Sequence, residues 1–312
     1  MKETVVAILG PTAVGKTKLS IEVAKAFNGE IISGDSMQIY KGMDIGTAKI
    51  KEEEKQGIPH YMIDIKKPDE SFTVAEFKSS VEHHIREISK RKNLPILVGG
   101  SGFYVQSVLY DFNFANVNRN KNLTNQFEKE INQYGIEPLY NRLSQIDPEQ
   151  AKKIHPNNHR RVIRALEIYE TTGLTMSDYQ KRQTKESPYN IIFIGLEMER
   201  ALLYDRINAR VEKMMEDGLL EEVRDLVVNQ SLKHAESMQA IGYKEFIPYF
   251  EGEYSLDRAI ELLKRNSRRY AKRQYTWFKN KLNIPWYNVM PNSIEETFRK
   301  ILGDLAGLLE NK

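Results

Sequence analysis

The stretch VVAILGPTAVGKT at residues 5–17 decides the fold class. Its first five residues are apolar and mostly β-branched, which is typical of a strand buried within a parallel sheet. GPTAVGKT at residues 10–17 has the pattern G-x-x-x-x-G-K-[ST], and apolar residues then recur every fourth position up to residue 27. A strand, a glycine loop and a helix in this order predict a phosphate-binding loop, because the loop's N–H groups and the helix's positive end attract an anion.

The loop pattern predicts that a phosphate group binds here, but it does not identify the compound that carries the phosphate. Lys16 supplies a mobile positive charge, and the Thr17 hydroxyl can bind Mg²⁺. Loops of this kind usually hold ATP or GTP, but they would hold any diphosphate. An NTPase or kinase would typically carry a metal-binding acid after a second buried strand, whereas the apolar run at residues 95–98 is followed by GGSGFY. The missing carboxylate weakens the nucleotide interpretation and leaves it open.

Further patterns indicate an α/β protein with an inserted helical region. Short apolar runs, which predict strands, lie at residues 30–32, 61–63, 95–98 and 190–196. Amphipathic patterns, which predict helices, lie at residues 74–89, 201–216, 219–228 and 256–281. Alternation of short strands and helices favours a parallel sheet. We therefore expect a P-loop NTPase-like core at residues 1–111 and 189–312.

Residues 112–188 carry helical patterns and no strand pattern. One helix should end at Gly135. Asp147-Pro148-Glu149-Gln150 should open another, with Asp147 as the N-cap, proline at the first position and Gln150 at the capping-box position. A third should end near Gly173. We interpret this segment as a helical insertion.

Composition excludes several classes of protein. The chain has 312 residues, no cysteine and a net charge of +3. It therefore has no disulfide, thiolate metal site or catalytic thiol, and it fits a reducing compartment. The N-terminal apolar run is too short for a signal-peptide core, and no run reaches the ~18 apolar residues that span a membrane. We expect a cytoplasmic monomer with no membrane partner.

A second polar loop follows the predicted strand at residues 30–32. It reads SGDSMQIY at residues 33–40. In an open parallel sheet, loops at the carboxyl ends of strands line the ligand crevice, so Asp35 should lie beside the phosphate loop. A carboxylate there needs a task, such as accepting a proton or organising Mg²⁺. Serine, glycine and aspartate are also ordinary turn residues, and composition alone does not decide between the two.

A basic segment lies near the C-terminus. Residues 264–273 contain six cations, with aromatic residues interleaved. Arginine suits phosphate, and aromatic rings can stack on unpaired bases. A solvated helix face with its aromatics in the core would show the same composition, and without other information it is the more common case. Arg206 and Arg210, four residues apart on a predicted helix, could likewise be surface cations near Asp205 and Glu212.

The motifs together resemble the tRNA dimethylallyltransferase (isopentenyltransferase) family over nearly the whole chain. The resemblance rests on GPTAVGKT, SGDSMQIYKGMDIGTAK, LVGGSGFY, DPEQAKKIHPNNHRRVIRALEIY, RINARVEKMMEDGLLEEV, AIGYKE and RRYAKRQYTWF, in that order. It implies that the loop holds the diphosphate of dimethylallyl diphosphate, and that the helical insertion grips the anticodon arm of tRNA. Two positions depart from the family pattern: Ser101 replaces threonine and keeps the hydroxyl, and Asn158 replaces an acid.

The resemblance also implies roles for particular residues. The diphosphate would be held by Gly10, Pro11, Thr12, Ala13, Val14, Gly15, Lys16, Thr17 and Arg210, with Mg²⁺ on Thr17. tRNA would be contacted by Asp35, Ser36, Met37, Gln38, Ser101, His159, Arg160, Arg161, Arg164, Arg269 and Arg273.

The expected reaction moves the dimethylallyl group to the exocyclic amine of the adenosine 3′ to the anticodon. Catalysis would rest on Asp35, Lys16, Thr17 and Arg210. Asp35 would accept the proton with an ordinary pKa near ~4, and Gln38 and Ser101 would read the base edge. Two rivals remain at this point, a P-loop kinase acting on a nucleoside or small metabolite and a tRNA-binding protein without catalytic activity.

Overall fold

The computed structural model describes residues 2–112, 120–182 and 186–310. The chain divides into two compact units. The first combines Met1–Leu109 with Ser187–Lys312, and the second is Tyr110–Glu186. None of the described helices is long and apolar enough to cross a membrane.

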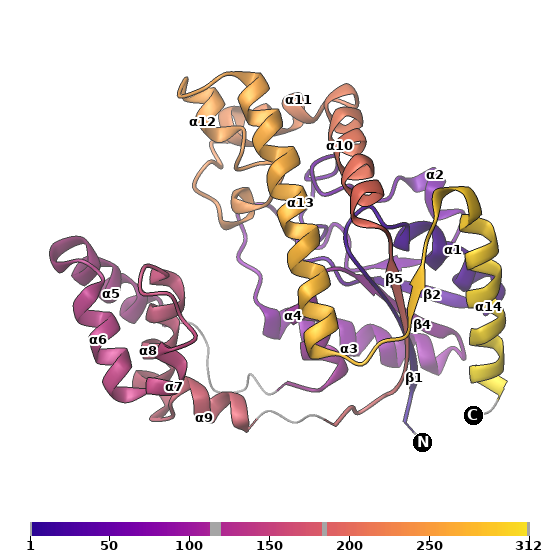
Figure 1. Ribbon diagram of the computed structural model, residues 1–312, viewed down its shortest axis with the longest axis horizontal. Helices are drawn as coiled ribbons and strands as arrows, with labels where there is room; N and C mark the ends of the chain where they lie inside the picture. Colours follow the sequence, from indigo (N-terminus) through magenta and orange to yellow (C-terminus); the bar gives the residue numbers. More distant parts are fainter. Residues whose placement is uncertain (1, 113–119, 183–185, 311–312) are drawn as a thin grey trace. The chain divides into compact units, whose positions relative to one another are not determined.

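The first unit is built on a six-stranded sheet with the order β3-β2-β4-β1-β5-β6 (Figure 1). The strands are β1 (Thr4–Leu9), β2 (Gly29–Ser33), β3 (His60–Tyr61), β4 (Leu94–Gly99), β5 (Asn190–Glu197) and β6 (Trp286–Asn288). Every pairing within this sheet is parallel. The expected α/β class is thus confirmed, and β1 takes a central place because its residues 5–9 are apolar and buried.

Helices cover both faces of the sheet. The helices of this unit are α1 (Lys16–Ala26), α2 (Glu52–Lys55), α3 (Val74–Lys90), α4 (Gly102–Leu109), α10 (Arg200–Glu216), α11 (Leu219–Arg224), α12 (Ile247–Phe250), α13 (Leu256–Lys281) and α14 (Ile294–Glu310). The connection from β1 to β2 and the one from β3 to β4 cross the sheet in opposite directions. Since parallel crossovers are right-handed, α1 and α3 lie on opposite faces.

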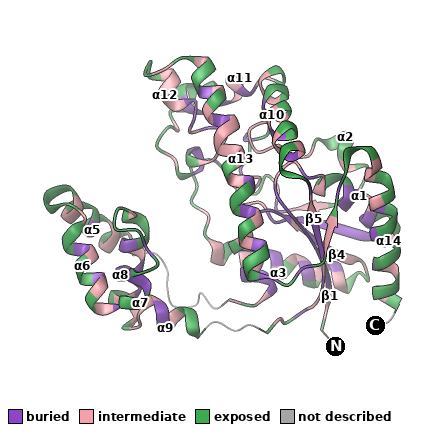
Figure 2. Cartoon of the chain, in the orientation of Figure 1, coloured by how far each residue is buried: buried purple, intermediate pink, exposed green. Residues whose placement is uncertain are grey.

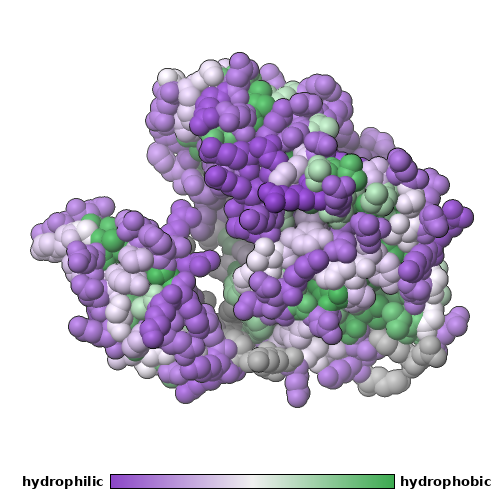
Figure 3. Space-filling view, viewed as in Figure 1, coloured by the Kyte–Doolittle hydropathy of each residue, from purple (hydrophilic) through white to green (hydrophobic). Residues whose placement is uncertain are grey.

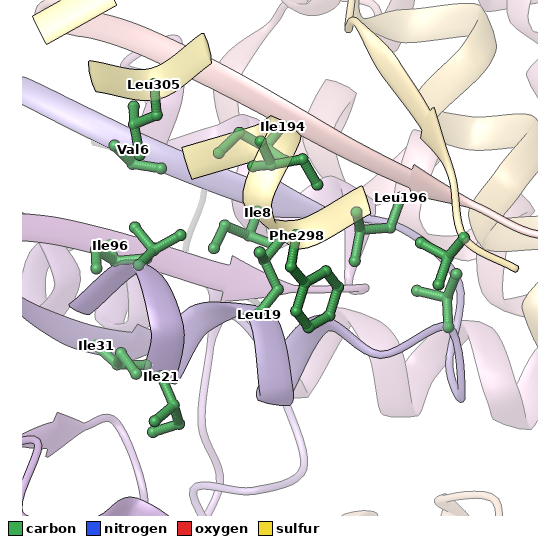
Figure 4. Packing of buried hydrophobic residues seen from close by; sticks show 14 of the residues in the cluster. Val6, Ile8, Leu19, Ile21, Ile31, Ile96, Ile194, Leu196, Phe298 and Leu305 are labelled. Atoms are coloured by element: carbon green, nitrogen blue, oxygen red, sulfur yellow. The ribbon is translucent and has the colours of Figure 1, made fainter. Parts of the chain in front are cut away.

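The core on the α1 face joins segments that are far apart in the sequence. Val6 and Ile8 of β1 pack with Leu19 of α1 and with Phe298 and Leu305 of α14 (Figure 4). These residues are at most 4% exposed. Figure 2 shows the central strands as almost continuously buried. The phosphate loop, residues 10–17, therefore starts from a fully buried part of the sheet.

The second unit is a helical bundle of its own. Its helices are α5 (Lys121–Tyr134), α6 (Glu137–Ile146), α7 (Pro148–Ala151), α8 (His159–Thr172) and α9 (Met176–Lys181). Its apolar core includes Phe127, Leu143 and Leu166. No described residue of this unit lies in a strand. The expected range for the insertion was 112–188, and the residues 113–119 and 183–185 within it lie outside the described part.

The helix expected to open at Asp147 is only the single turn α7. Asp147 caps it by accepting from the N–H of Gln150 at 3.0 Å, but the side-chain oxygen of Gln150 has no partner. The expected capping box is therefore incomplete. The reason is that the N–H of Asp147, which the Gln150 side chain would accept in a capping box, donates to the carbonyl of Leu143 at the end of α6 at 2.8 Å. The carboxylate of Asp147 is buried and also accepts from the N–H and hydroxyl of Ser177.

Several elements, among them α4, β6 and α14, were not predicted from the sequence. The helix expected at residues 219–228 is the short α11 followed by the π-helix Asp225–Asn229. Glu197, the last residue of β5, accepts from Tyr275 and Lys279 and so joins this strand to α13.

Candidate active site

Three loops meet at one edge of the sheet because β2, β4 and β1 are neighbours and parallel. The loops after β2 and β4 are in backbone contact: the N–H of Gly34 donates to Val98 at 2.7 Å. A Cβ on Gly99 would lie 2.6 Å from the oxygen of Gly34. Only glycine permits this approach, which holds the 33–40 loop against the loop that follows β4.

A cavity of about 500 Å³ opens where the loops meet. It is lined by five residues of the phosphate loop, Thr12, Ala13, Gly15, Lys16 and Thr17, and by Asp35, Gln38, Gly99, Arg210, Tyr270 and others. Gly10, Pro11 and Val14 are absent from its lining, and Val14 is fully buried in the core. These three residues, which were expected to hold the diphosphate, therefore belong to the part of the loop that does not face the cavity.

The phosphate loop has the conformation that its glycines predict. Gly10 and Gly15 have φ of 153° and 109°, and a Cβ on Gly10 would lie 2.6 Å from the oxygen of Leu196. α1 starts at Lys16, so its positive end faces the cavity. The ammonium of Lys16 donates to the carbonyl oxygens of Gly10 and Pro11 at 3.0 and 2.7 Å. Its charge therefore lies over the loop.

The surroundings of Lys16 lower the pKa of its amine. Burial and the charge of Arg210, opposed in part by the carboxylate of Asp35, bring the pKa of Lys16 down to about 7. A bound diphosphate would favour the charged form of this amine, because opposite charges stabilise each other in a desolvated site.

Two arginines of α10 reach the phosphate loop. Arg206 donates to the carbonyl of Ala13 at 2.9 Å, and Arg210 donates to the hydroxyl of Thr12 at 3.2 Å. Arg206 is an exposed cation, as in the alternative, but it reaches the loop, whereas Arg210 is half-buried and lines both cavities. The helix carries both arginines to the loop because it follows β5, which lies next to β1 in the sheet.

Asp35 lies beside these cations, partly exposed to the cavity. The N–H of Met37 donates to its Oδ1 at 2.8 Å. Burial raises the pKa of Asp35 above its ordinary value, although the Met37 N–H and the charges of Lys16 and Arg210 act in the opposite direction. The expectation of an ordinary pKa was therefore wrong. Desolvation disfavours the charged carboxylate, which makes Asp35 a stronger base than an aspartate in water.

A second cavity, of about 340 Å³, adjoins the first. Six residues line both cavities: Thr12, Asp35, Thr47, Ala48, Arg210 and Tyr270. The second cavity is otherwise lined by apolar side chains such as Ile207, Met214 and Leu263. Its lining also includes Ser36, Met37, Glu236, Gln239, Lys244, Ser267 and Arg273. Asp35 thus lies at the junction of a cationic cavity and a more apolar one.

Gln274 is a site residue that was not predicted from the sequence. This residue of α13 is 5% exposed, and its Oε1 accepts from the N–H of Thr12 at 2.8 Å. A Cβ on Gly100 would lie 2.1 Å from its Nε2. The signal was present in the helix pattern, because Gln274 falls on the same buried face as Leu263, Ala271 and Phe278. A polar residue on an apolar face calls for a hydrogen-bond partner.

The two residues expected to read the base edge are engaged within the protein. Gln38 lines the first cavity, and its Oε1 accepts from the hydroxyl of Ser33 at 2.9 Å. Ser101 is 9% exposed, lines neither cavity and accepts from the N–H of Ser36 at 3.4 Å. Their roles toward a base stay predictions.

The basic segment divides into paired and exposed cations. Lys264 and Arg268 bind Glu212 and Asn208 of α10. Arg269 and Arg273 are exposed, and Arg273 also lies over the ring of Tyr270 at 5.6 Å. Figure 3 shows a predominantly hydrophilic surface over this part of the unit.

In the second unit, the expected tRNA contacts gather at the start of α8. His159, Arg160 and Arg161 are exposed, whereas Arg164 donates to the buried Glu167 at 2.9 Å. Asn158 caps the helix by accepting from the N–H of Arg161 at 3.3 Å. The replacement of an acid by Asn158 therefore keeps the cap, because the amide oxygen serves as the acceptor.

Comparison with known proteins agrees with this geometry. A family model described as IPP transferase matches residues 38–281. The chain is 57% identical to the tRNA dimethylallyltransferase of Oceanobacillus iheyensis, over 100% of this chain and 99% of that protein. The full-length tRNA isopentenylpyrophosphate transferase of Bacillus halodurans has a TM-score of 0.75 at 50% identity, with 99% of this chain and 98% of that chain covered. A eukaryotic dimethylallyltransferase acting on tRNA has a TM-score of 0.86 at 31% identity, with 99% and 80% covered.

A parallel sheet with a glycine loop between β1 and α1, and a buried lysine at the start of that helix, defines a protein of the P-loop NTPase-like fold. Within this class the resemblance seen in the sequence is confirmed. The chain belongs to the tRNA dimethylallyltransferase, or IPP transferase, family, and it is a prenyltransferase. The kinase and the inactive binding protein are thereby set aside.

Proposed function

We propose that dimethylallyl diphosphate binds in the first cavity and that the second admits the adenosine 3′ to the anticodon of a tRNA. The observation that carries this assignment is the position of Asp35, which lines both cavities. Asp35 is the only carboxylate among the six residues that line both cavities, so it is the one that can accept a proton at the bond between the two substrates. The cationic cavity suits the diphosphate, and the apolar walls of the other suit the faces of a flipped base.

The diphosphate lies over the phosphate loop in this proposal. The loop's N–H groups and the positive end of α1 bind its oxygens. Lys16 leaves the carbonyl oxygens of Gly10 and Pro11 and pairs with the anion, and Arg210 approaches from α10. These charges stabilise the negative charge that grows on the leaving diphosphate, which is the main electrostatic contribution to the rate.

The donor atoms at the loop fit Mg²⁺. Thr17, the second residue of α1, lines the first cavity together with the carboxylate of Asp35. Mg²⁺ prefers oxygen and is usually held by one or two protein groups together with substrate phosphates and water. Thr17 would hold it, with Asp35 nearby, and the ion would neutralise charge on the diphosphate.

The transfer step is a displacement at carbon. The exocyclic nitrogen of adenine bonds to the first carbon of the dimethylallyl group while the bond from that carbon to the diphosphate oxygen breaks. The amine becomes acidic only as its bond to carbon forms, and Asp35 accepts the proton. Its raised pKa increases its strength as a base.

Phosphate contacts hold the tRNA. Arg269 and Arg273 on α13 are exposed, and Arg273 also lines the second cavity. His159, Arg160 and Arg161 offer a second basic cluster at the start of α8. Such contacts give affinity that depends on salt and not on base sequence.

The direct test is mass analysis of tRNA after incubation with the protein, dimethylallyl diphosphate and Mg²⁺. One dimethylallyl group should be added per tRNA, on the adenosine 3′ to the anticodon. A tRNA with guanosine at that position should gain nothing. Addition at other adenosines, or none at all, would contradict the proposal.

A further inference from the structure

The loop at residues 43–49, which reads MDIGTAK, is held by one carboxylate from another part of the chain. Oε2 of Glu222, on α11, accepts from the N–H groups of Asp44 at 2.9 Å and Ile45 at 2.8 Å. Oε1 accepts from the N–H of Gly46 at 3.0 Å and from the hydroxyl of Tyr243 at 2.6 Å. Three consecutive N–H groups that point at one anion form a nest, and here the anion is a side chain of the protein itself.

The packing around this nest leaves no room for a side chain at Gly46 or Gly242. A Cβ on Gly46 would lie 2.5 Å from the ring of Tyr243. Gly242, with φ of 103°, lies so close that its own Cβ would be 2.9 Å from the oxygen of Gly46. The loop therefore lies directly on the turn at residues 242–243. Burial and the charge of Glu222 raise the pKa of Tyr243, so its hydroxyl stays protonated and donates to Glu222.

The loop forms part of the wall of both cavities. Thr47 and Ala48 line the first and the second cavity alike. The carbonyl of Thr47 also accepts from Nε2 of Gln38 at 3.3 Å, while Oε1 of Gln38 accepts from Ser33 at 2.9 Å. A chain of contacts thus runs from Glu222 through the 43–49 loop to Gln38, at the wall of the donor cavity.

We propose that Glu222 is a positioning residue for prenyl transfer: its carboxylate holds the 43–49 loop so that Thr47 and Ala48 shape the junction of the cavities and Thr47 orients Gln38. The inference rests on the proposed assignment of the two cavities. It adds a residue that touches neither substrate.

The carboxylate is needed because all of its neighbours are donors. Glutamine in its place would turn an NH₂ group toward backbone N–H groups or toward the Tyr243 hydroxyl, whichever way its amide is oriented. At least one donor would lose its acceptor, and the loop would move. Misplacement of a site wall by about 1 Å can lower a rate by up to ~10²-fold.

The experiment compares Glu222→Gln with Glu221→Gln, which changes the exposed carboxylate next to it on the same helix. Single-turnover transfer is measured with saturating tRNA and donor, together with the thermal midpoint and tRNA affinity of each variant. Glu222→Gln should slow transfer about 10-fold or more with unchanged tRNA affinity, and Glu221→Gln should stay within about 2-fold of the parent. A parent-like rate for Glu222→Gln would overturn the proposal.

A double-mutant cycle separates positioning from general destabilisation. If Glu222 acts through Gln38, then adding Glu222→Gln to Gln38→Leu should cost little further rate, because the two residues form one unit. If the losses of rate in the two single variants add fully in the double variant, Glu222 does not act through Gln38. If Glu222→Gln does not fold, Tyr243→Phe decides, since it removes only one of the four donors. It should slow transfer severalfold, and a parent-like rate would overturn the proposal.

Measuring Asp35→Asn in parallel distinguishes a failure of the positioning role of Glu222 from a failure of the proposed assignment of the cavities. If Asp35→Asn is inactive and Glu222→Gln is fully active, only the positioning role fails. If Asp35→Asn is fully active, the assignment of the cavities itself fails, and the inference fails with it.

Discussion

Replacing Asp35 with asparagine removes a base while keeping the shape of the side chain. The Oδ1 atom that accepts from the N–H of Met37 remains, so the 33–40 loop should keep its turn. What disappears is the negative charge beside Lys16 and Arg210 and the oxygen that can bind a proton. The substitution therefore isolates the chemical role of the carboxylate from its role in the fold.

The size of the effect follows from the environment of Asp35. A positioned general base contributes about 10²–10⁴-fold to a rate. Burial raises the pKa of Asp35, which moves it toward the operating pH and increases its contribution. We expect Asp35→Asn to lower the single-turnover rate by at least ~10²-fold, equivalent to about 3 kcal/mol of transition-state stabilisation.

The stability of the variant provides an internal check. A carboxyl group whose pKa is higher in the folded than in the unfolded protein binds protons more tightly when folded, so its ionisation at neutral pH opposes folding. Asp35→Asn removes this ionisation. The thermal midpoint at pH 7 should therefore be equal to or higher than that of the parent, and a large decrease would show that the loop had been disrupted.

The assay is single-turnover transfer with tRNA bound, at two concentrations of Mg²⁺, for Asp35→Asn and for Asp205→Asn. Asp205 is an exposed carboxylate on α10 and serves as the matched control. A near-normal rate for Asp35→Asn would remove this residue from the mechanism. Recovery of most of the rate at high Mg²⁺ would reassign Asp35 from proton acceptor to organiser of the metal ion. tRNA affinity should change little in either variant, because phosphate contacts dominate it.

Three further predictions follow from the charges of the site. Replacing Arg269 and Arg273 with alanine should weaken tRNA binding and reduce its salt dependence by about one to two units of slope, and an unchanged slope would mean that these arginines only cover the helix. Dimethylallyl diphosphate with Mg²⁺ should support turnover without ATP, and stoichiometric hydrolysis of a nucleotide would contradict this. The pKa of Lys16 is about 7 in the free protein, and a bound anion should raise it, so donor binding at pH 8 should take up a proton. Calorimetry in buffers of different ionisation enthalpy measures this uptake, which Lys16→Met should abolish.

Local patterns were enough for the strands and helices that border the phosphate loop. β1 and α1 could be expected because a short apolar run, glycines of fixed spacing and a four-residue periodicity are all properties of neighbouring residues. α14 could not be expected in its role, although Phe298 and Leu305 are essential parts of the core. Its pattern shows an apolar face but does not indicate that this face packs on α1 and the sheet.

The pKa of Asp35 was predicted wrongly for the same reason. An aspartate in a polar loop is ionised with an ordinary pKa unless other segments desolvate it, and those segments lie far away in the chain. Arg210 and Gln274 both contact Thr12 of the phosphate loop, although they lie 198 and 262 residues after it in the sequence. A local sequence pattern cannot predict contacts between residues so far apart along the chain.

The sequence by itself determined the phosphate loop, the α/β class and the family, because a loop that binds phosphate through its backbone needs glycines at set positions and a strand and helix on either side. Only the tertiary structure decided which cations face the loop, that two cavities meet at Asp35, and that Glu222 holds the wall between them. The physical reason is that charge, burial and hydrogen bonding act between atoms that are close in space, whereas periodicity and motif spacing describe only residues that are close along the chain.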